Sequence, residues 1–62
     1  MKVGKFKVGQ KVLIREYCPS KNIDFKYIGE IVYINNKKRN CLVIDEYGED
    51  FDADFDEIIE IL

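Results

Sequence analysis

The strongest constraint on the fold is the spacing of apolar side chains, which recur at every second position rather than at helical spacing. Near the start of the chain, Val12 and Ile14 alternate with Lys11 and Arg15. This alternation, which follows a turn at "GQ", is the pattern of a half-buried β-strand. No segment sustains helical periodicity over the ~10 residues that a helix needs. We therefore predict an all-β chain.

Turn-forming residues divide the next part of the chain into short strands. Residues 17–25, "YCPSKNIDF", carry Pro, Ser, Asn and Asp and are expected to form an irregular loop. Residues 27–34 are rich in Ile, Val and Tyr, which suit a pleated sheet, and Gly29 within them indicates a bulge or a bend. The segment 35–40 is expected to turn the chain with Asn at positive φ, and 41–45 to follow as a short buried strand.

The segment 45–57, "DEYGEDFDADFDE", holds eight carboxylates in thirteen positions. "EYGE" predicts a hairpin with Gly48 in a conformation that other residues rarely adopt. Asp54 and Glu57 have the spacing of a capping box, so one helical turn is expected near residue 55, before a last strand in "IIEIL". Apolar residues and aspartates alternate, which predicts an extended strand with one acidic face. Phe51, Ala53 and Phe55 form its apolar side, and Asp50, Asp52, Asp54 and Asp56 its acidic side.

Four stretches, "FKVGQKVLI", "YIGEIVYI", "NCLVID" and "FDEIIEI", resemble the SH3-like barrel superfamily, particularly its KOW- and Tudor-like members. Those members often show a V-G-D-x-V entry, a G-x-V second strand and a helical turn before the final strand. The resemblance implies a small five-stranded SH3-like β-barrel with one short helical turn before the last strand, in a single domain over residues 1–62. The sequence pattern of signalling SH3 domains is absent, so no polyproline groove is expected, and no binding residue is carried over from the family.

Missing residue types limit the chemistry of the chain. It contains no His and a single Ser, Ser20. Ser–His and Cys–His nucleophile pairs are therefore excluded, as is any zinc site that needs imidazole, and two cysteines alone do not close a structural zinc site. The aspartates of residues 50–54 copy the opening of an EF-hand calcium loop, but Phe55 stands where that loop needs Gly and Ile61 where it needs Glu. We expect a protein that is not an enzyme and has no cofactor and no metal.

Composition also suggests a compartment and a source. No apolar run approaches the ~18 residues of a membrane span, and the start of the chain lacks the apolar stretch of a secretion signal. Cys18 and Cys41 fit reduced thiols. We therefore expect a cytoplasmic protein with no membrane partner. The abundance of Ile, Lys, Asn and Tyr is typical of an AT-rich genome, such as that of a low-GC bacterium or its mobile elements.

Opposite charges are segregated along the chain. The first 39 residues carry all ten Lys and Arg against three acids, a net charge of +7, whereas the remaining 23 carry nine acids and no base, a net charge of −9. The first and last strands are neighbours in the barrel that the sequence resembles. We therefore expect cross-strand ion pairs, with Lys11 and Arg15 facing Glu57 or Glu60, to absorb part of this segregation.

Two groups of side chains are the candidate binding residues. Tyrosine is a common anchor of protein interfaces, and the candidates for binding a protein are Tyr17, Tyr27 and Tyr47. Cations at a hairpin turn can hold the phosphates of a nucleic acid, and the candidates are Lys37, Lys38 and Arg39, which we call the basic tip.

These features favour a small non-catalytic binding module whose partner is a protein, contacted through the 17–25 loop and the tyrosines. The first alternative is a nucleic-acid-binding KOW/Tudor-like module that uses the basic tip. The second is a phage or mobile-element inhibitor whose acidic face, residues 50–57, mimics nucleic acid, because alternate strand residues present anions ~6.6–6.8 Å apart. The oligomeric state is left open by the sequence.

Overall fold

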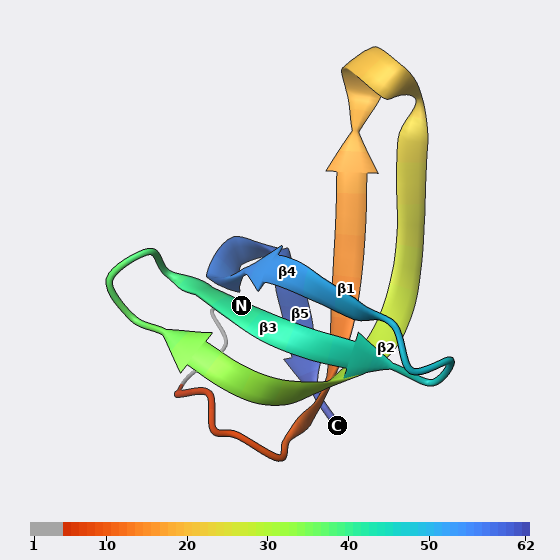
Figure 1. Cartoon of the computed structure of the whole chain (residues 1–62). Coiled ribbons are helices and arrows are strands. Elements are labelled where there is room, and N and C mark those ends of the chain that lie inside the picture. The colour runs from red at the N-terminus through yellow and green to blue at the C-terminus, as the bar shows by residue number, and fades with distance from the viewer. Residues whose placement is uncertain (1–4) are drawn as a thin grey trace.

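The computed structural model describes residues 5–62, which form a five-stranded antiparallel sheet with almost no helix (Figure 1). In chain order the elements are β1 (Lys11–Cys18), η1 (Pro19–Lys21), β2 (Ile23–Asn35), β3 (Asn40–Asp45), β4 (Asp50–Asp54), η2 (Phe55–Glu57) and β5 (Ile58–Ile61), where η denotes a single 3-10 turn. The predictions of an all-β chain, of five strands and of a helical turn before the last strand are confirmed.

The strands follow the order β4-β3-β2-β1-β5, so that β4 and β5 are the edges of the sheet. The first and last strands pair, as predicted, with Val12 opposite Ile61 and Leu13 opposite Glu60. Within residues 5–62, β4 and β5 do not pair with each other. The sheet is therefore open, whereas a barrel requires closure.

The strand β2 is long because it pairs with two partners in succession. Its residues 23–30 pair with β1, whereas residues 29–35 pair with β3. Gly29 lies at this changeover and is buried, and a Cβ at this position would lie 3.2 Å from the Cβ of Val43. Glycine therefore permits the close approach of β2 to β3. Of the bulge or bend predicted at Gly29, the bulge lies instead between Ile31 and Tyr33, where the register shifts.

Beyond this changeover the β1–β2 hairpin projects away from the sheet as an arm, which we define as residues 15–27 (Figure 1). The prediction of an irregular loop over 17–25 is wrong, because the ladder continues to the pair Cys18–Ile23 and only residues 19–22 lie outside the strands. Pro19 begins η1, and Asn22 takes a positive φ of 56° that reverses the chain. The turn-forming residues are thus confined to the tip of the arm.

The core consists of side chains that lie at alternate positions of the strands. Seven residues are 3% exposed or less: Val12, Ile14, Ile31, Cys41, Val43, Ala53 and Ile58. The predicted alternation is confirmed in β1, where Lys11 and Arg15 are exposed, and in β4, where Ala53 is buried between two exposed aspartates. Phe6 packs against Phe55, with the ring centroids 4.9 Å apart, at the margin of this core.

The turns between the strands match the sequence predictions except at one residue. Gly48 takes the expected positive φ, 82°. In the β2–β3 turn, however, Arg39 and not an Asn takes the positive φ, 57°. The Arg39 guanidinium lies 5.5 Å from the centroid of the Phe55 ring, and the Arg39 carbonyl accepts a hydrogen bond from the Phe55 N–H at 2.9 Å. These two contacts hold Arg39 in a conformation that is otherwise unfavourable for a residue with a Cβ.

Candidate functional site

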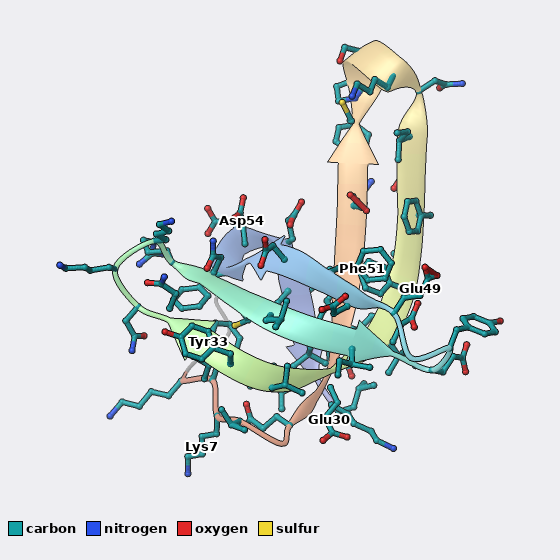
Figure 2. All side chains as sticks on the ribbon, in the orientation of Figure 1. Lys7, Glu30, Tyr33, Glu49, Phe51 and Asp54 are labelled. Atoms are coloured by element: carbon teal, nitrogen blue, oxygen red, sulfur yellow. The ribbon has the colours of Figure 1, made fainter. Side chains whose placement is uncertain are left out.

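Three aromatic rings lie in contact where the arm meets the sheet. The ring centroids of Phe25 and Tyr27 are 5.8 Å apart, and those of Tyr27 and Phe51 are 5.5 Å apart. We call these three residues the aromatic cluster. β2 and β4 are separated by β3 in the sheet, so the cluster forms only because β2 leaves β3 at Gly29 and carries Tyr27 towards Phe51. Figure 2 shows Phe51 on the side of β4 that faces the arm. Phe25 is 49% exposed and Phe51 is 40% exposed, which leaves both rings accessible to a partner.

The aromatic cluster lies in an acidic environment. The pKa of Tyr27 is raised to about 12, first by burial and then by the negative charges of Glu16, Glu57 and Asp45. Glu16 is directly opposite Phe25 in the β1–β2 ladder, so its carboxylate belongs to the same face of the arm. The Tyr27 hydroxyl therefore stays protonated and available as a hydrogen-bond donor at neutral pH.

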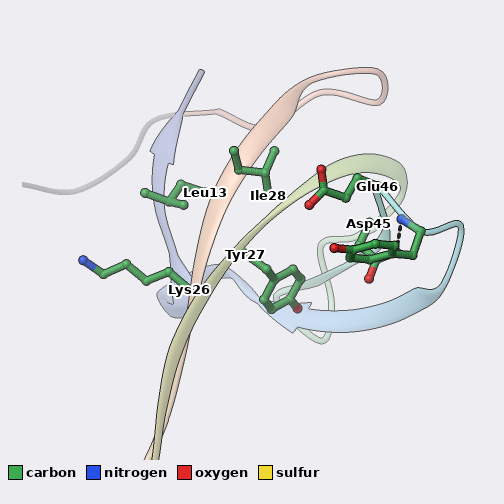
Figure 3. Close-up of a pocket in the computed structure, with 7 residues that line it drawn as sticks. Leu13, Lys26, Tyr27, Ile28, Asp45 and Glu46 are labelled. Carbon is green, nitrogen blue, oxygen red and sulfur yellow. Dashed lines mark hydrogen bonds between the residues drawn. The ribbon is translucent and has the colours of Figure 1, made fainter.

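Two of the three predicted tyrosines lie around one hollow. This hollow, of about 390 Å³, is lined by Leu13, Lys26, Tyr27, Ile28, Asp45, Glu46 and Tyr47 (Figure 3). A second hollow, of about 450 Å³, shares Ile28, Asp45 and Glu46 with the first and adds Lys11, Gly29, Glu30, Ile44 and Leu62. We call the two adjoining hollows the outer groove. Tyr27 belongs to both the aromatic cluster and the outer groove.

The third predicted tyrosine lies on the opposite face of the arm. Tyr17 pairs with Asp24 and thus shares a face with Arg15 and Lys26 rather than with Phe25 and Tyr27. The Arg15 guanidinium lies 5.0 Å from the centroid of the Tyr17 ring, which is 59% exposed. The structure therefore does not bring Tyr17 together with Tyr27 and Tyr47.

The basic tip is remote from these tyrosines. Lys37, Lys38 and Arg39 are exposed in the turn before β3, whereas Tyr47 lies in the turn after β3. The length of β3 separates the two turns by about 17 Å. A single small ligand would therefore not contact the basic tip and the outer groove together.

The predicted ion pairs between the first and last strands are absent from residues 5–62. Arg15 instead pairs with Asp24, with Nε to Oδ1 at 3.0 Å and Nη2 to Oδ2 at 3.1 Å. This pair raises the pKa of Arg15 and lowers the pKa of Asp24, in each case first through the hydrogen bond between them. Glu57 accepts a hydrogen bond from the Asp54 backbone N–H at 2.9 Å, in the expected capping arrangement. The expectation was wrong because Arg15 lies beyond the end of β5 and closest to its own hairpin partner strand.

The acidic side of β4 is consequently a row of carboxylates on the solvent face of an edge strand. Asp50, Asp52 and Asp54 are exposed and lie opposite Ile44, Leu42 and Asn40 of β3. Within residues 5–62, no group of three or more His, Cys, Asp or Glu side chains is arranged to hold a metal ion.

The two cysteines differ in environment. Cys18 is half-buried near the tip of the arm, and its Sγ lies 3.3 Å from the Ser20 Oγ. This hydrogen bond, followed by the backbone of Lys21, lowers the pKa of the Cys18 thiol. Burial raises the pKa of the Cys41 thiol, which belongs to the core.

The sequence analysis did not propose three of these surface residues, Phe25, Ile28 and Phe51, as binding residues. Phe25 was assigned to an irregular loop, although Ile23, Phe25 and Tyr27 alternate with polar residues as in a strand. Phe51 was correctly placed on the apolar side of β4, but its meeting with Tyr27 depends on the path of β2. Alternation could thus have identified the strand that carries Phe25, but not the cluster.

Comparisons with protein families, with curated proteins and with solved structures find no match for this chain. No helix within residues 5–62 has the length and apolar character needed to cross a membrane.

Proposed function

We propose that this chain is a small non-catalytic module that binds a protein partner through the aromatic cluster. The observation that carries this proposal is the contact of Tyr27 with both Phe25 and Phe51, which holds two exposed rings in place. Aromatic residues are the usual anchors of protein interfaces. Rings that are already ordered also lose little conformational freedom when a partner binds.

We also propose that the scaffold is SH3-like and that the protein is cytoplasmic. The SH3-like proposal is supported by the five antiparallel strands, by the pairing of β1 with β5 and by the 3-10 turn before β5. The open sheet leaves the relationship to a closed barrel as part of the proposal.

A second candidate function is that of an inhibitor whose acidic face mimics nucleic acid. It is favoured by one observation, namely that Asp50, Asp52 and Asp54 are exposed and take part in no ion pair among residues 5–62. Binding of nucleic acid by the basic tip is a third candidate, supported by the exposure of Lys37 and Lys38.

The proposal is tested by affinity capture of proteins from cells that express the chain, with mass spectrometry as the readout. The test variant is Phe25→Ser, and the matched control is Tyr33→Ser, which removes an aromatic ring that is 61% exposed on another part of β2. We expect a protein that wild type and Tyr33→Ser retain and that Phe25→Ser retains about tenfold less. Circular dichroism establishes that both variants are folded.

Three results would decide against the aromatic cluster. Equal capture by wild type and Phe25→Ser would reject it directly. Recovery of nucleic acid, with affinity that falls steeply as salt rises, would favour the basic tip. Loss of the captured protein on replacing Asp50 and Asp52 with Asn, with Phe25→Ser retaining it, would favour the inhibitor.

A further inference from the structure

The outer groove is a second apolar surface, and its floor lies outside the aromatic cluster. Ile28 is 49% exposed, Ile44 is 38% exposed and Leu62 is 58% exposed. In the β1–β2 ladder, Leu13 lies opposite Ile28 and Lys11 lies opposite Glu30. In the β2–β3 ladder, Glu30 lies opposite Ile44. These side chains therefore share the solvent face of the sheet. A contiguous set of exposed aliphatic side chains on a small protein is typical of an interaction surface rather than of scattered surface residues.

The two sides of the first hollow carry opposite charge. Lys26 lies on one side of Leu13 and Ile28, and Asp45 and Glu46 lie on the other (Figure 3). Asp45 already caps the β3–β4 turn, because its Oδ1 accepts hydrogen bonds from the backbone N–H groups of Tyr47 at 2.9 Å and Glu49 at 3.0 Å. Asp45 is therefore engaged in the turn, and Lys26 and Glu46 are the other charged side chains that line this hollow.

An arrangement with a cation on one side and an anion on the other is self-complementary. A two-fold axis through the apolar floor brings the lysine side of one copy against the glutamate side of the other. A groove with two sides of the same charge would instead repel its own copy. We propose that the outer groove is the interface of a homodimer, in which Lys26 of each chain lies beside Glu46 of its partner.

The size of the chain is compatible with such an interface. A standard interface buries ~800 Å² on each partner, about one sixth of the 4902 Å² accessible surface of this chain. Small domains of this length bury a low fraction of their surface on folding and benefit most from association. Burial of Ile28, Ile44 and Leu62 against a second copy would extend a core that contains only seven fully buried residues among those described.

The first test is the mass in solution, measured by sedimentation velocity and by light scattering over a range of concentration. We expect wild type to reach twice its monomer mass of 7.3 kDa as concentration rises. Ile28→Ser should weaken self-association by about tenfold or more, the equivalent of about 1.4 kcal/mol. The matched control is Ile59→Ser, which removes an aliphatic side chain that is 42% exposed and lines neither hollow. This control should dimerise like wild type.

The second test exchanges the charges. Lys26→Glu and Glu46→Lys should each be monomeric in solution. In a dimer of either variant, residue 26 of each chain would lie beside a residue 46 of the same charge. When the two variants are mixed, every contact again joins opposite charges, and the dimer mass should return. The mixture also guards against misfolding, since a chain that cannot fold would not be rescued by its counterpart.

A wild-type protein that stays monomeric up to about 1 mM would overturn the homodimer, as a weaker dissociation constant is not that of a stable interface. A wild-type dimer that Ile28→Ser leaves intact, or that the mixed charge variants fail to restore, would overturn the assignment of its interface to the outer groove. These outcomes are independent of the aromatic cluster, because neither Ile28 nor Glu46 belongs to it.

Discussion

At the scale of single residues, Gly29 determines the path of β2. A Cβ added there would lie 3.2 Å from Cβ and 3.3 Å from Cγ2 of Val43, and 3.4 Å from the carbonyl oxygen of Ile44. We expect Gly29→Ala to lower the free energy of unfolding by ~1–3 kcal/mol through overpacking, measured by urea denaturation. Val43→Ala keeps the Cβ contact but removes the Cγ2 atom that would lie 3.3 Å away, so the double variant should lose less than the sum of the two single losses. Additive losses would mean that contact with the Val43 Cγ2 is not the cause.

Tyr27 should make the stability of the fold sensitive to alkaline pH. Its pKa is raised from 10.0 to about 12 in the folded chain, first by burial. A raised pKa means that the folded state holds the proton more tightly than the unfolded state. The stabilisation is therefore complete below pH 10 and is lost as the pH rises through about 12.

Denaturation of wild type and Tyr27→Phe at a series of pH values tests this expectation. The free energy of unfolding of wild type should fall more steeply above pH 10 than that of Tyr27→Phe, which has no phenol at this position. Tyr33→Phe, which changes an exposed tyrosine, is the control and should follow wild type. Parallel curves for wild type and Tyr27→Phe would show that the Tyr27 hydroxyl is not buried as described.

At the scale of elements, the two halves of β2 differ in support. Residues 29–35 lie over the core and pair with β3, whereas residues 23–27 pair with β1 alone in the arm. Local opening costs least where few apolar contacts hold the backbone. We expect the amide hydrogens of the arm that bond to β1 to exchange faster than amides of the core half, such as that of Ile31, which donates to the Gln10 carbonyl at 2.9 Å. Equal protection along β2, measured by NMR, would show that the arm and the sheet unfold as one unit.

The same elements show how far the sequence predicts the fold. Alternation identified β1 and β4. The content of Ile, Val and Tyr identified the core half of β2, and short apolar segments that follow turns identified β3 and β5. The arm was missed, since Pro19, Ser20 and Asn22 were taken to indicate a loop, although they occupy only the tip between two strands. Turn-forming residues predict that the chain turns, but they do not predict where the strands on either side of the turn begin and end.

The candidate site was less accessible to sequence analysis than the fold. Tyr27 and Tyr47 were proposed as binding residues, but their separation from Tyr17 depends on which face of β1 and β2 each side chain occupies. The aromatic cluster and the Arg15–Asp24 pair depend on the change of partner at Gly29 and on the register of the hairpin. The first joins distant segments and the second depends on the register of a hairpin, so neither can be read from the composition of a single segment.

At the scale of the whole molecule, the basic tip is separate from the outer groove, whereas the aromatic cluster adjoins the groove. The basic tip lies at one end of β3, and the outer groove reaches the turn at the other end. The aromatic cluster joins the arm to β4, and Tyr27 is the residue it shares with the outer groove. A homodimer formed through Ile28 and Ile44 would therefore present two arms, each with exposed rings for a partner.

The acidic half of the chain should oppose folding rather than support it. Eight carboxylates fall within residues 45–57, and the ion pair within residues 5–62 joins Arg15 to Asp24 instead. Asp50 and Asp52 lie at alternate positions of one strand, where like charges repel. We expect Asp50→Asn with Asp52→Asn to raise the free energy of unfolding by ~0.3–1 kcal/mol at low ionic strength, and by less at high salt, where the repulsion is screened.

Urea denaturation at low and high salt measures this effect, with the pair Lys37→Gln and Lys38→Gln as control. The control removes two positive charges, which are opposite in sign to the aspartates, from the turn before β3. It should not stabilise the chain. A loss of stability in the aspartate variant would show that these carboxylates have favourable partners after all. In that case the acids of β4 would balance the charge segregation of the chain within its own fold, and they would no longer support the inhibitor as a candidate function.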